Sequence, residues 1–135
     1  MTREEIMAVR KVLKQIRKQE EYLAGLKALK VSMERQVSRG HSGTPSSKIE
    51  GLIVKIMMAE GKLAQLQARR FQEQELLTEK ILEQDYSALI QAMLIYRYAE
   101  CLTWTEISEI MQMGRRRLYE LNKKFIAHLD AHFDC

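Results

Sequence analysis

Two long stretches without helix breakers constrain the fold of this chain more than any other feature. The 135 residues include a single proline, Pro45, and only six glycines. Apolar residues recur every three or four positions from about Arg3 to Ser38 and again from about Lys48 to Glu83, the period of an amphipathic helix. Residues 39–47 concentrate glycine, serine and the proline, which is typical of a loop. We therefore expect two helices of similar length that fold back as an antiparallel hairpin.

The apolar stripes of this predicted hairpin are longer than one seam can cover. In the first helix Glu20, Lys27 and Lys30 interrupt a strict heptad, so this helix is coiled-coil-like rather than a zipper. Two helices alone leave much apolar surface in water. We therefore predict a homodimer in which two hairpins form a four-helix bundle. The residues expected to face the second copy are Ile6, Val9, Leu13 and Ile16 on the first helix and Leu63, Leu66, Phe71 and Leu77 on the second.

The last third of the chain has the pattern of a helix-turn-helix. A segment from about Asp85 to Ala99, with Asp85 as its cap, precedes it. Two short helices then bury one face each and turn tightly, and the second opens on three arginines. The apolar positions are Ile107, Ile110, Met111, Met113, Leu118, Leu121, Phe125 and Leu129. No strand candidate occurs, so we predict an all-α chain with a hairpin domain at 1–84 and a helix-turn-helix domain at 85–135.

The order of residues around these two helices follows a known pattern. It comprises Arg97-Tyr98, Leu102-Thr103, Glu106-Ile107, Ile110-Met111, Met113, Arg115, Arg117, Leu118, Leu121, Phe125 and Leu129. This pattern resembles the domain of bacterial sigma factors that reads the −35 promoter element. With the long charged N-terminal helices, the whole chain resembles the small phage and prophage regulators of late transcription of the ArpU and RinA type. The resemblance implies a sequence-specific DNA-binding regulator of transcription.

Five positions depart from the sigma pattern. Ser108 replaces a usual alanine, Gln112 a turn glycine, and Gly114 the Ser or Thr that caps the second helix, although glycine is a tolerable cap. Arg116 and Glu120 stand where the pattern tends to have Glu and Gln, at positions expected to meet base edges. We therefore expect a DNA site that differs from a housekeeping −35 element.

The basic second helix supplies the candidate DNA contacts. Residues 114–124 would enter the major groove, where arginine donates two hydrogen bonds to guanine. Successive residues point about 100° apart, so three neighbouring arginines cannot share one edge. We assign Arg115 and Arg116 to bases, Arg117, Lys123 and Lys124 to phosphates, and Tyr119 and Glu120 to bases or backbone. The alternative is a solvated basic face, and the rival function is a protein-interaction module that binds a host protein such as RNA polymerase.

Other residue types point away from enzymes, metals and membranes. No Gly-rich phosphate loop, Ser/His/Asp arrangement or HExxH motif occurs, so we expect no catalytic residue and no cofactor. His128, His132 and Cys135 have a spacing that could hold a metal, but a structural zinc needs about four ligands, so none is expected. Cys101 and Cys135 without a CxxC motif suggest a reducing compartment. With no signal peptide or apolar span, we expect a cytoplasmic protein without membrane contact.

Three further features stay open between a structural and a functional interpretation. Trp104 either packs at the start of the first short helix or touches the DNA backbone. The methionines, among them Met57, Met58, Met111 and Met113, either fill the core or form an adaptable surface. The basic residues of the first helix, Arg10, Lys11, Lys14, Arg17 and Lys18, either are solvated or meet DNA or an acidic partner.

Overall fold

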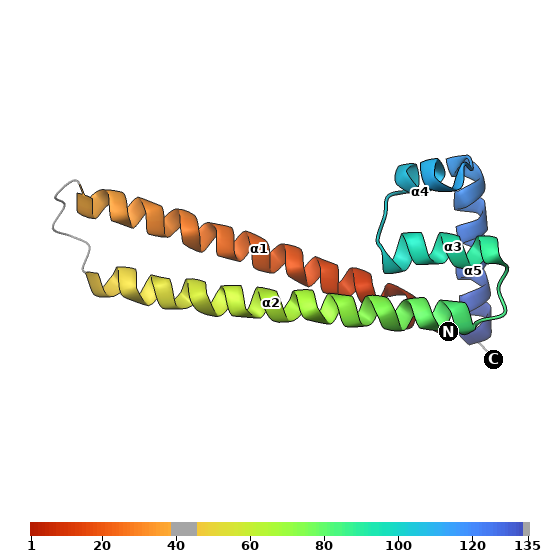
Figure 1. Ribbon diagram of the computed structural model, residues 1–135, viewed down its shortest axis with the longest axis horizontal. Helices are drawn as coiled ribbons and strands as arrows, with labels where there is room; N and C mark the ends of the chain where they lie inside the picture. The colour runs from red at the N-terminus through yellow and green to blue at the C-terminus, as the bar shows by residue number, and fades with distance from the viewer. Residues whose placement is uncertain (39–45, 134–135) are drawn as a thin grey trace. The chain divides into compact units, whose positions relative to one another are not determined.

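The computed structural model describes residues 1–38 and 46–133 (Figure 1). All regular structure in these residues is helical, which confirms the all-α prediction. The elements are α1 (Arg3–Ser38), α2 (Ser46–Glu83), α3 (Ala88–Leu94), the π-helical segment η1 (Ile95–Ala99), α4 (Trp104–Met111) and α5 (Arg115–Phe133). Of the predicted loop at 39–47, residues 39–45 lie outside the described part, and α2 already begins at Ser46.

The chain packs as two compact units whose boundary runs through both long helices. One unit is Leu13–Arg69, here called the hairpin unit. The other joins Met1–Val12 to the chain from Arg70 onward and is here called the helix-turn-helix unit. The expected division at residue 84 differs from this one, because the start of α1 and the end of α2 contribute to the core around α3, α4 and α5.

The core of the helix-turn-helix unit draws side chains from every element. Its buried members are Ile6 and Val9 of α1, Leu77 and Ile81 of α2, Met93 and Leu94 of α3, Tyr98 and Ala99 of η1, Ile107 of α4, and Leu118, Phe125 and Leu129 of α5. Ile6 and Val9 have no exposed surface, and Leu77 has 2%. The prediction that these three face a second copy is therefore wrong: the chain's own helices cover them, at about 1.5–3 kcal/mol of burial each.

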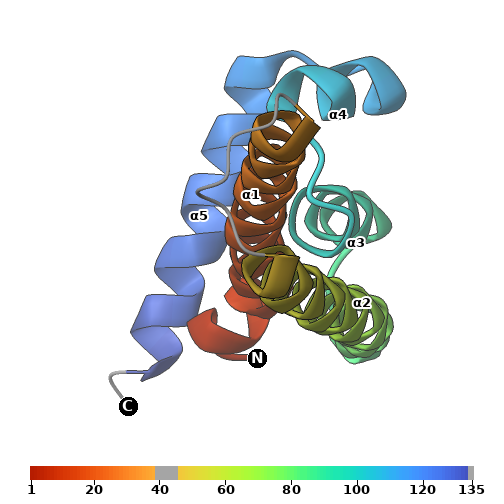
Figure 2. The same cartoon turned by 90° about the vertical axis from the view of Figure 1, so that its left-hand side faces the viewer.

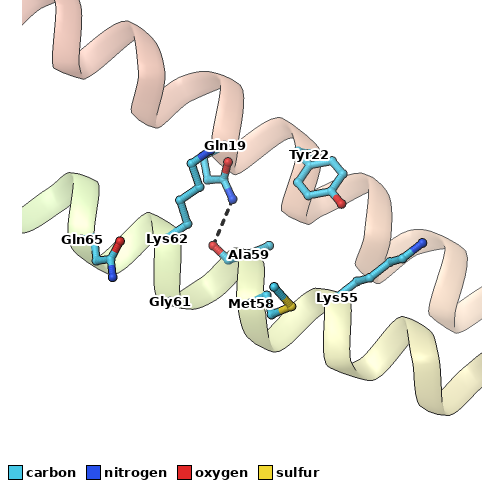
Figure 3. A pocket seen from close by; sticks show the side chains of 8 residues that line it. All are labelled: Gln19, Tyr22, Lys55, Met58, Ala59, Gly61, Lys62 and Gln65. Atoms are coloured by element: carbon cyan, nitrogen blue, oxygen red, sulfur yellow. Dashed lines mark hydrogen bonds between the residues drawn. The ribbon is translucent and has the colours of Figure 1, made fainter.

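The hairpin unit has a smaller core of its own. Leu23 of α1 packs with Leu52, Ile56 and Ala59 of α2, and half-buried Leu26, Met33 and Leu63 flank them. The side-chain amide of Gln19 donates to the carbonyl of Ala59 at 3.1 Å (Figure 3). These contacts run along a seam between antiparallel helices, as predicted from the period of the apolar residues.

The buried faces of the two long helices differ in detail from the apolar stripes predicted from the sequence. Val12 is buried with 3% exposure, whereas Leu13 is only half-buried. Val9, Val12 and Ile16 are three and four positions apart and share a face, and Leu13 lies roughly 70° from the middle of that face. On α2, Phe71 was expected in the stripe but is 68% exposed.

The segment predicted as one helix over 85–99 consists of two parts. Ser87, not Asp85, is its cap: the Ser87 hydroxyl accepts from the Ile90 N–H at 3.3 Å. The α-helix widens at Ile95 into η1, and the Glu100 N–H donates to the Ile95 carbonyl at 2.9 Å. Cys101 then turns the chain with a φ of 57°. The wider turn brings Tyr98 and Ala99, both nearly fully buried, into the core.

Candidate nucleic-acid interface

The first helix of the helix-turn-helix starts at a reciprocal cap. The Thr103 hydroxyl accepts from the Glu106 N–H at 3.2 Å and donates to the Glu106 carboxylate at 3.0 Å. Thr103 is therefore a side-chain N-cap, which satisfies an otherwise unpaired backbone N–H at the helix start. Ile107, fully buried, anchors α4 in the core. Ile110 was expected on the same buried face but is 52% exposed, so α4 buries a narrower face than predicted.

The turn after α4 is made without glycine. Gln112 adopts the left-handed conformation, with φ 52° and ψ 45°. The Met113 N–H donates to the Ser108 carbonyl at 3.2 Å, and the Ser108 hydroxyl donates to the Met113 carbonyl. Ser108 and Gln112 are two of the departures from the sigma pattern, and here they act together. The Ser108 hydroxyl, which an alanine would not have, stabilises the turn in which Gln112 stands in place of a glycine.

The second helix is fixed by one face and exposed by the other. The Gly114 carbonyl accepts from the Leu118 N–H at 3.2 Å, so Gly114 stands at the cap position, as predicted. Leu118, Phe125 and Leu129 are buried in the core. Both views show α4 lying across the first turns of α5 (Figures 1 and 2). The opposite face of α5 is therefore open along its first three turns.

All seven predicted DNA contacts lie on this open face or its edges. The exposed residues are Arg115, Arg116, Arg117, Tyr119, Glu120, Lys123 and Lys124. Arg115 donates to the Thr105 hydroxyl at 3.4 Å, and Arg116 lies 3.6 Å from the Glu120 carboxylate. The Arg116 side chain is 95% exposed, so solvent screens this pair and it holds the arginine only weakly. The five cations, Arg115, Arg116, Arg117, Lys123 and Lys124, thus form an exposed basic edge on α5.

An aromatic stack supports the start of the interface. The rings of Trp104 and Tyr119 meet edge to face with centroids 5.3 Å apart, and the Arg97 guanidinium lies 4.6 Å from the Trp104 centroid. Trp104 is half-buried, which agrees with its packing interpretation. Tyr119 was predicted to contact DNA. Its ring packs against Trp104 within the chain and is 49% exposed.

Two arginines lie beneath this stack. Arg97 donates to the Leu102 carbonyl at 3.0 Å, and burial lowers the pKa of its guanidinium, with the neighbouring Arg10 charge acting in the same direction. Arg10 lies 5.6 Å from the Tyr98 centroid and donates to the Arg97 carbonyl at 3.4 Å. Sequence reasoning placed Arg10 on the basic outer face of the first helix, but it is half-buried here. Its buried Nε finds no hydrogen-bond partner among the described residues.

Neither a metal site nor a membrane span adds to this interface in the part of the chain that the structure describes. No cluster of His, Cys, Asp and Glu side chains there could hold a metal ion, and no helix there is both long and apolar enough to span a bilayer. The side chain of His132 and all of Cys135, two of the three ligands considered above, lie outside the described residues.

Comparisons of the chain with protein-family models, with curated proteins and with solved structures found no match.

Proposed function

We propose that the protein is a sequence-specific DNA-binding regulator of transcription, of the phage and prophage type, with residues 114–124 as the reading helix. One observation carries the proposal. Five exposed cations cluster on the first three turns of α5, the helix that follows a capped helix and a tight turn. A local basic field of this kind is what a major-groove reader needs, whatever the net charge of the whole chain.

Base reading would start at the first turn of α5. Arg115 and Arg116 donate to guanine O6 and N7, while Arg117, Lys123 and Lys124 contact phosphates and set the register. Arg116 leaves Glu120 when it meets a base, at low cost because the pair is highly exposed. Glu120 is then available to accept from a cytosine amino group.

The remaining partners belong to the same proposal. The helical hairpin would provide oligomerisation or a contact with RNA polymerase, and the resemblance of roughly residues 86–130 to the −35-reading domain of sigma factors supports a role in transcription and hence action in the cytoplasm. We also propose that the protein works as a homodimer, since most readers of this kind bind two half-sites. The capped α4 and the tied turn support this function, because they hold α5 in one orientation.

A selection of bound fragments from genomic DNA, followed by affinity measurements on the selected site, tests the proposal. We expect the selected site to bind far more tightly than a random duplex, since specific readers exceed their nonspecific affinity by about 10³-fold or more. We also expect affinity for the random duplex to fall steeply with salt, because each phosphate contact releases counterions. Absence of any salt-dependent DNA binding would overturn the proposal.

A second candidate function has one observation in its favour. Ile110 on α4 and Tyr119 on α5 are about half exposed, and the aliphatic side chain of Ile110 does not suit a phosphate surface. A helix-turn-helix that docks a host protein would use such side chains. Salt distinguishes the two functions: a protein contact through these apolar groups would be nearly insensitive to ionic strength, whereas DNA binding would not.

A further inference from the structure

Helix α2 carries a second apolar face that the hairpin does not use. The seam with α1 takes Leu52, Ile56 and Ala59. On the other side of α2, Val54 is 55% exposed, Met57 66% and Met58 71%. These are among the most exposed large apolar side chains in the described residues. Single exposed apolar residues are normal on a protein surface, but here three lie within five positions of one helix.

This face is free of charge over five helical turns. At about 100° per residue, the positions within roughly 70° of the direction opposite the seam can be read from the sequence. Between residues 51 and 68 they are Gly51, Val54, Met57, Met58, Gly61, Ala64, Gln65 and Ala68. We call this set the outer face of α2. Figure 3 shows three of its members, Met58, Gly61 and Gln65, where they border a hollow that the flanking Lys55 and Lys62 and Gln19 and Tyr22 of α1 also line. A solvated helix face is normally charged, so this one is unusual.

The distribution of side-chain size along the outer face is uneven. The N-terminal half holds the bulky apolar residues Val54, Met57 and Met58, and the C-terminal half holds the small residues Ala64 and Ala68 together with Gln65. Gly61 lies between the halves, and an added Cβ there would meet no atom within 4 Å. Two identical faces of this kind are complementary when they run antiparallel, because Val54 and Met58 then oppose alanines and the flexible side chains of Met57 and Gln65 oppose each other. If the two faces ran parallel and in register, bulky residues would collide with bulky residues, and the small residues would leave a gap.

We propose that the outer face of α2 packs against the same face of a second copy, antiparallel, with the two-fold axis near Gly61. Counting outward from Gly61, Val54 then meets the second copy's Ala68, and Met58 meets its Ala64. The glycine and alanines allow the two helix axes to approach closely, about 8 Å at the short end of helix packing. Each copy uses the same patch, as a closed two-fold dimer requires.

The properties of the face favour a second copy over another partner. It contains no charge to select a charged partner, and its size pattern is matched by its own sequence. The inference rests on the homodimer of the proposed function and names its interface. It also replaces the interface predicted from the sequence, whose residues Ile6, Val9, Ile16 and Leu77 are buried within one chain.

A charge placed on the outer face tests the interface. In Gly61→Glu the new carboxylate would be buried between the copies without a partner. The matched control is Gly25→Glu on α1, where an added Cβ likewise meets no atom within 4 Å. By sedimentation equilibrium at micromolar concentration, we expect dimers of the unmodified chain and of Gly25→Glu, and monomers of Gly61→Glu. Far-UV circular dichroism should show equal helix content in all three chains.

Cross-linking tests the antiparallel orientation. In chains whose own cysteines are replaced by serine, Met58→Cys and Ala64→Cys are prepared separately and then mixed before mild oxidation. We expect the mixture to yield disulfide-linked dimers that join the two variants, and Met58→Cys alone to yield few. Efficient cross-linking of Met58→Cys with itself would show a parallel dimer and overturn the proposal.

The outcomes separate this inference from the function on which it rests. A dimer that persists in Gly61→Glu overturns the interface and leaves the homodimer standing. A well-folded monomer of the unmodified chain overturns both. Binding of Gly61→Glu to a random duplex reports on the DNA proposal independently, because residue 61 is not part of the basic edge of α5.

Discussion

The hydroxyl of Tyr98 donates a hydrogen bond of 2.6 Å to the side-chain oxygen of Asn122, and this bond joins η1 to the middle of α5. Tyr98 is 5% exposed, so its hydroxyl depends on this partner inside the core. Asn122 lies between the cap at Gly114 and the buried Leu129, on the helix that carries the basic edge. The bond therefore fixes the rotation of α5 about its own axis.

Removing this bond should lower stability without unfolding the protein. We expect Tyr98→Phe to reduce the free energy of unfolding by about 1 kcal/mol, the usual net value of such a bond. Asn122→Ala should lose a similar amount, and the double variant should lose clearly less than the sum. Urea denaturation measures all three. Additive losses would show that the two groups are not coupled, and Tyr119→Phe, on an exposed tyrosine, serves as the control.

The left-handed Gln112 should be improved by glycine. A side chain in this conformation costs about 1–2 kcal/mol, which glycine does not incur. We expect Gln112→Gly to raise the free energy of unfolding by about 1 kcal/mol. The gain is smaller than the full strain energy because glycine also increases the conformational entropy of the unfolded chain. Gln112→Ala keeps the strained conformation and should be nearly neutral. A thermal melt of Gln112→Gly that is unchanged or lowered would mean that the turn is not strained.

The Thr103 cap at the start of α4 should be worth about 1 kcal/mol. Thr103→Ala removes both hydrogen bonds to Glu106 and should lower the melting temperature, whereas Thr103→Ser keeps the hydroxyl and should restore most of the loss. The neighbouring Thr105→Ala is the control, because Thr105 is not the cap. Equal losses in Thr103→Ala and Thr103→Ser would assign the effect to the methyl group instead.

The arginines and the lysines of α5 should affect DNA binding in different ways. Arg115→Ala and Arg116→Ala should each cost about 1–3 kcal/mol on the specific site and relax the preference at one base pair. Lys124→Ala should weaken all sequences alike and reduce the salt slope by about one unit. Competition binding against a panel of single-base variants measures both effects. Unchanged base preference in both arginine variants contradicts the assignment to bases.

The cap of α5 offers a test that leaves the cations intact. An added Cβ at Gly114 would meet no atom within 4 Å, so Gly114→Ser fits and should be neutral or slightly stabilising. Gly114→Val has no hydroxyl and a branched side chain, and it should lower stability or affinity. If the valine variant matches the unmodified chain in both, residue 114 does not act as the cap.

The sequence predicted the elements better than their partners. The long helices, the tight turn and the cap at Gly114 follow from local spacing and residue type, and they were predicted correctly. Ser87 as the cap of α3 was missed because Asp85 two residues earlier is an equally good cap by type. The widening at η1 has no local signal, since its cause is the placement of Tyr98 and Ala99 in a core assembled from distant segments.

The same reason explains the errors in the candidate site. Periodicity gives the apolar face of a helix but not the element that covers it, so Ile110 was expected to be buried and Arg10 to be solvated. The inward position of Arg10 depends on Tyr98 and Arg97, nearly ninety positions away along the chain. The seven surface residues of α5 were easier to identify, because exposure of a polar face requires no knowledge of a neighbour.

The burial of Ile6 and Val9 beside Leu118 and Leu129 has a consequence for folding. Residues from the two ends of the chain close one core, so this core has a high contact order and cannot complete before most of the chain is available. A helical hairpin that forms earlier would lower the entropy cost of closing this core. It brings the start of α1 and the end of α2 together and so shortens the loop that remains to be closed. A fragment that begins at residue 85 would lack four of the twelve buried residues of this core, and the basic edge of α5 would lose part of its support.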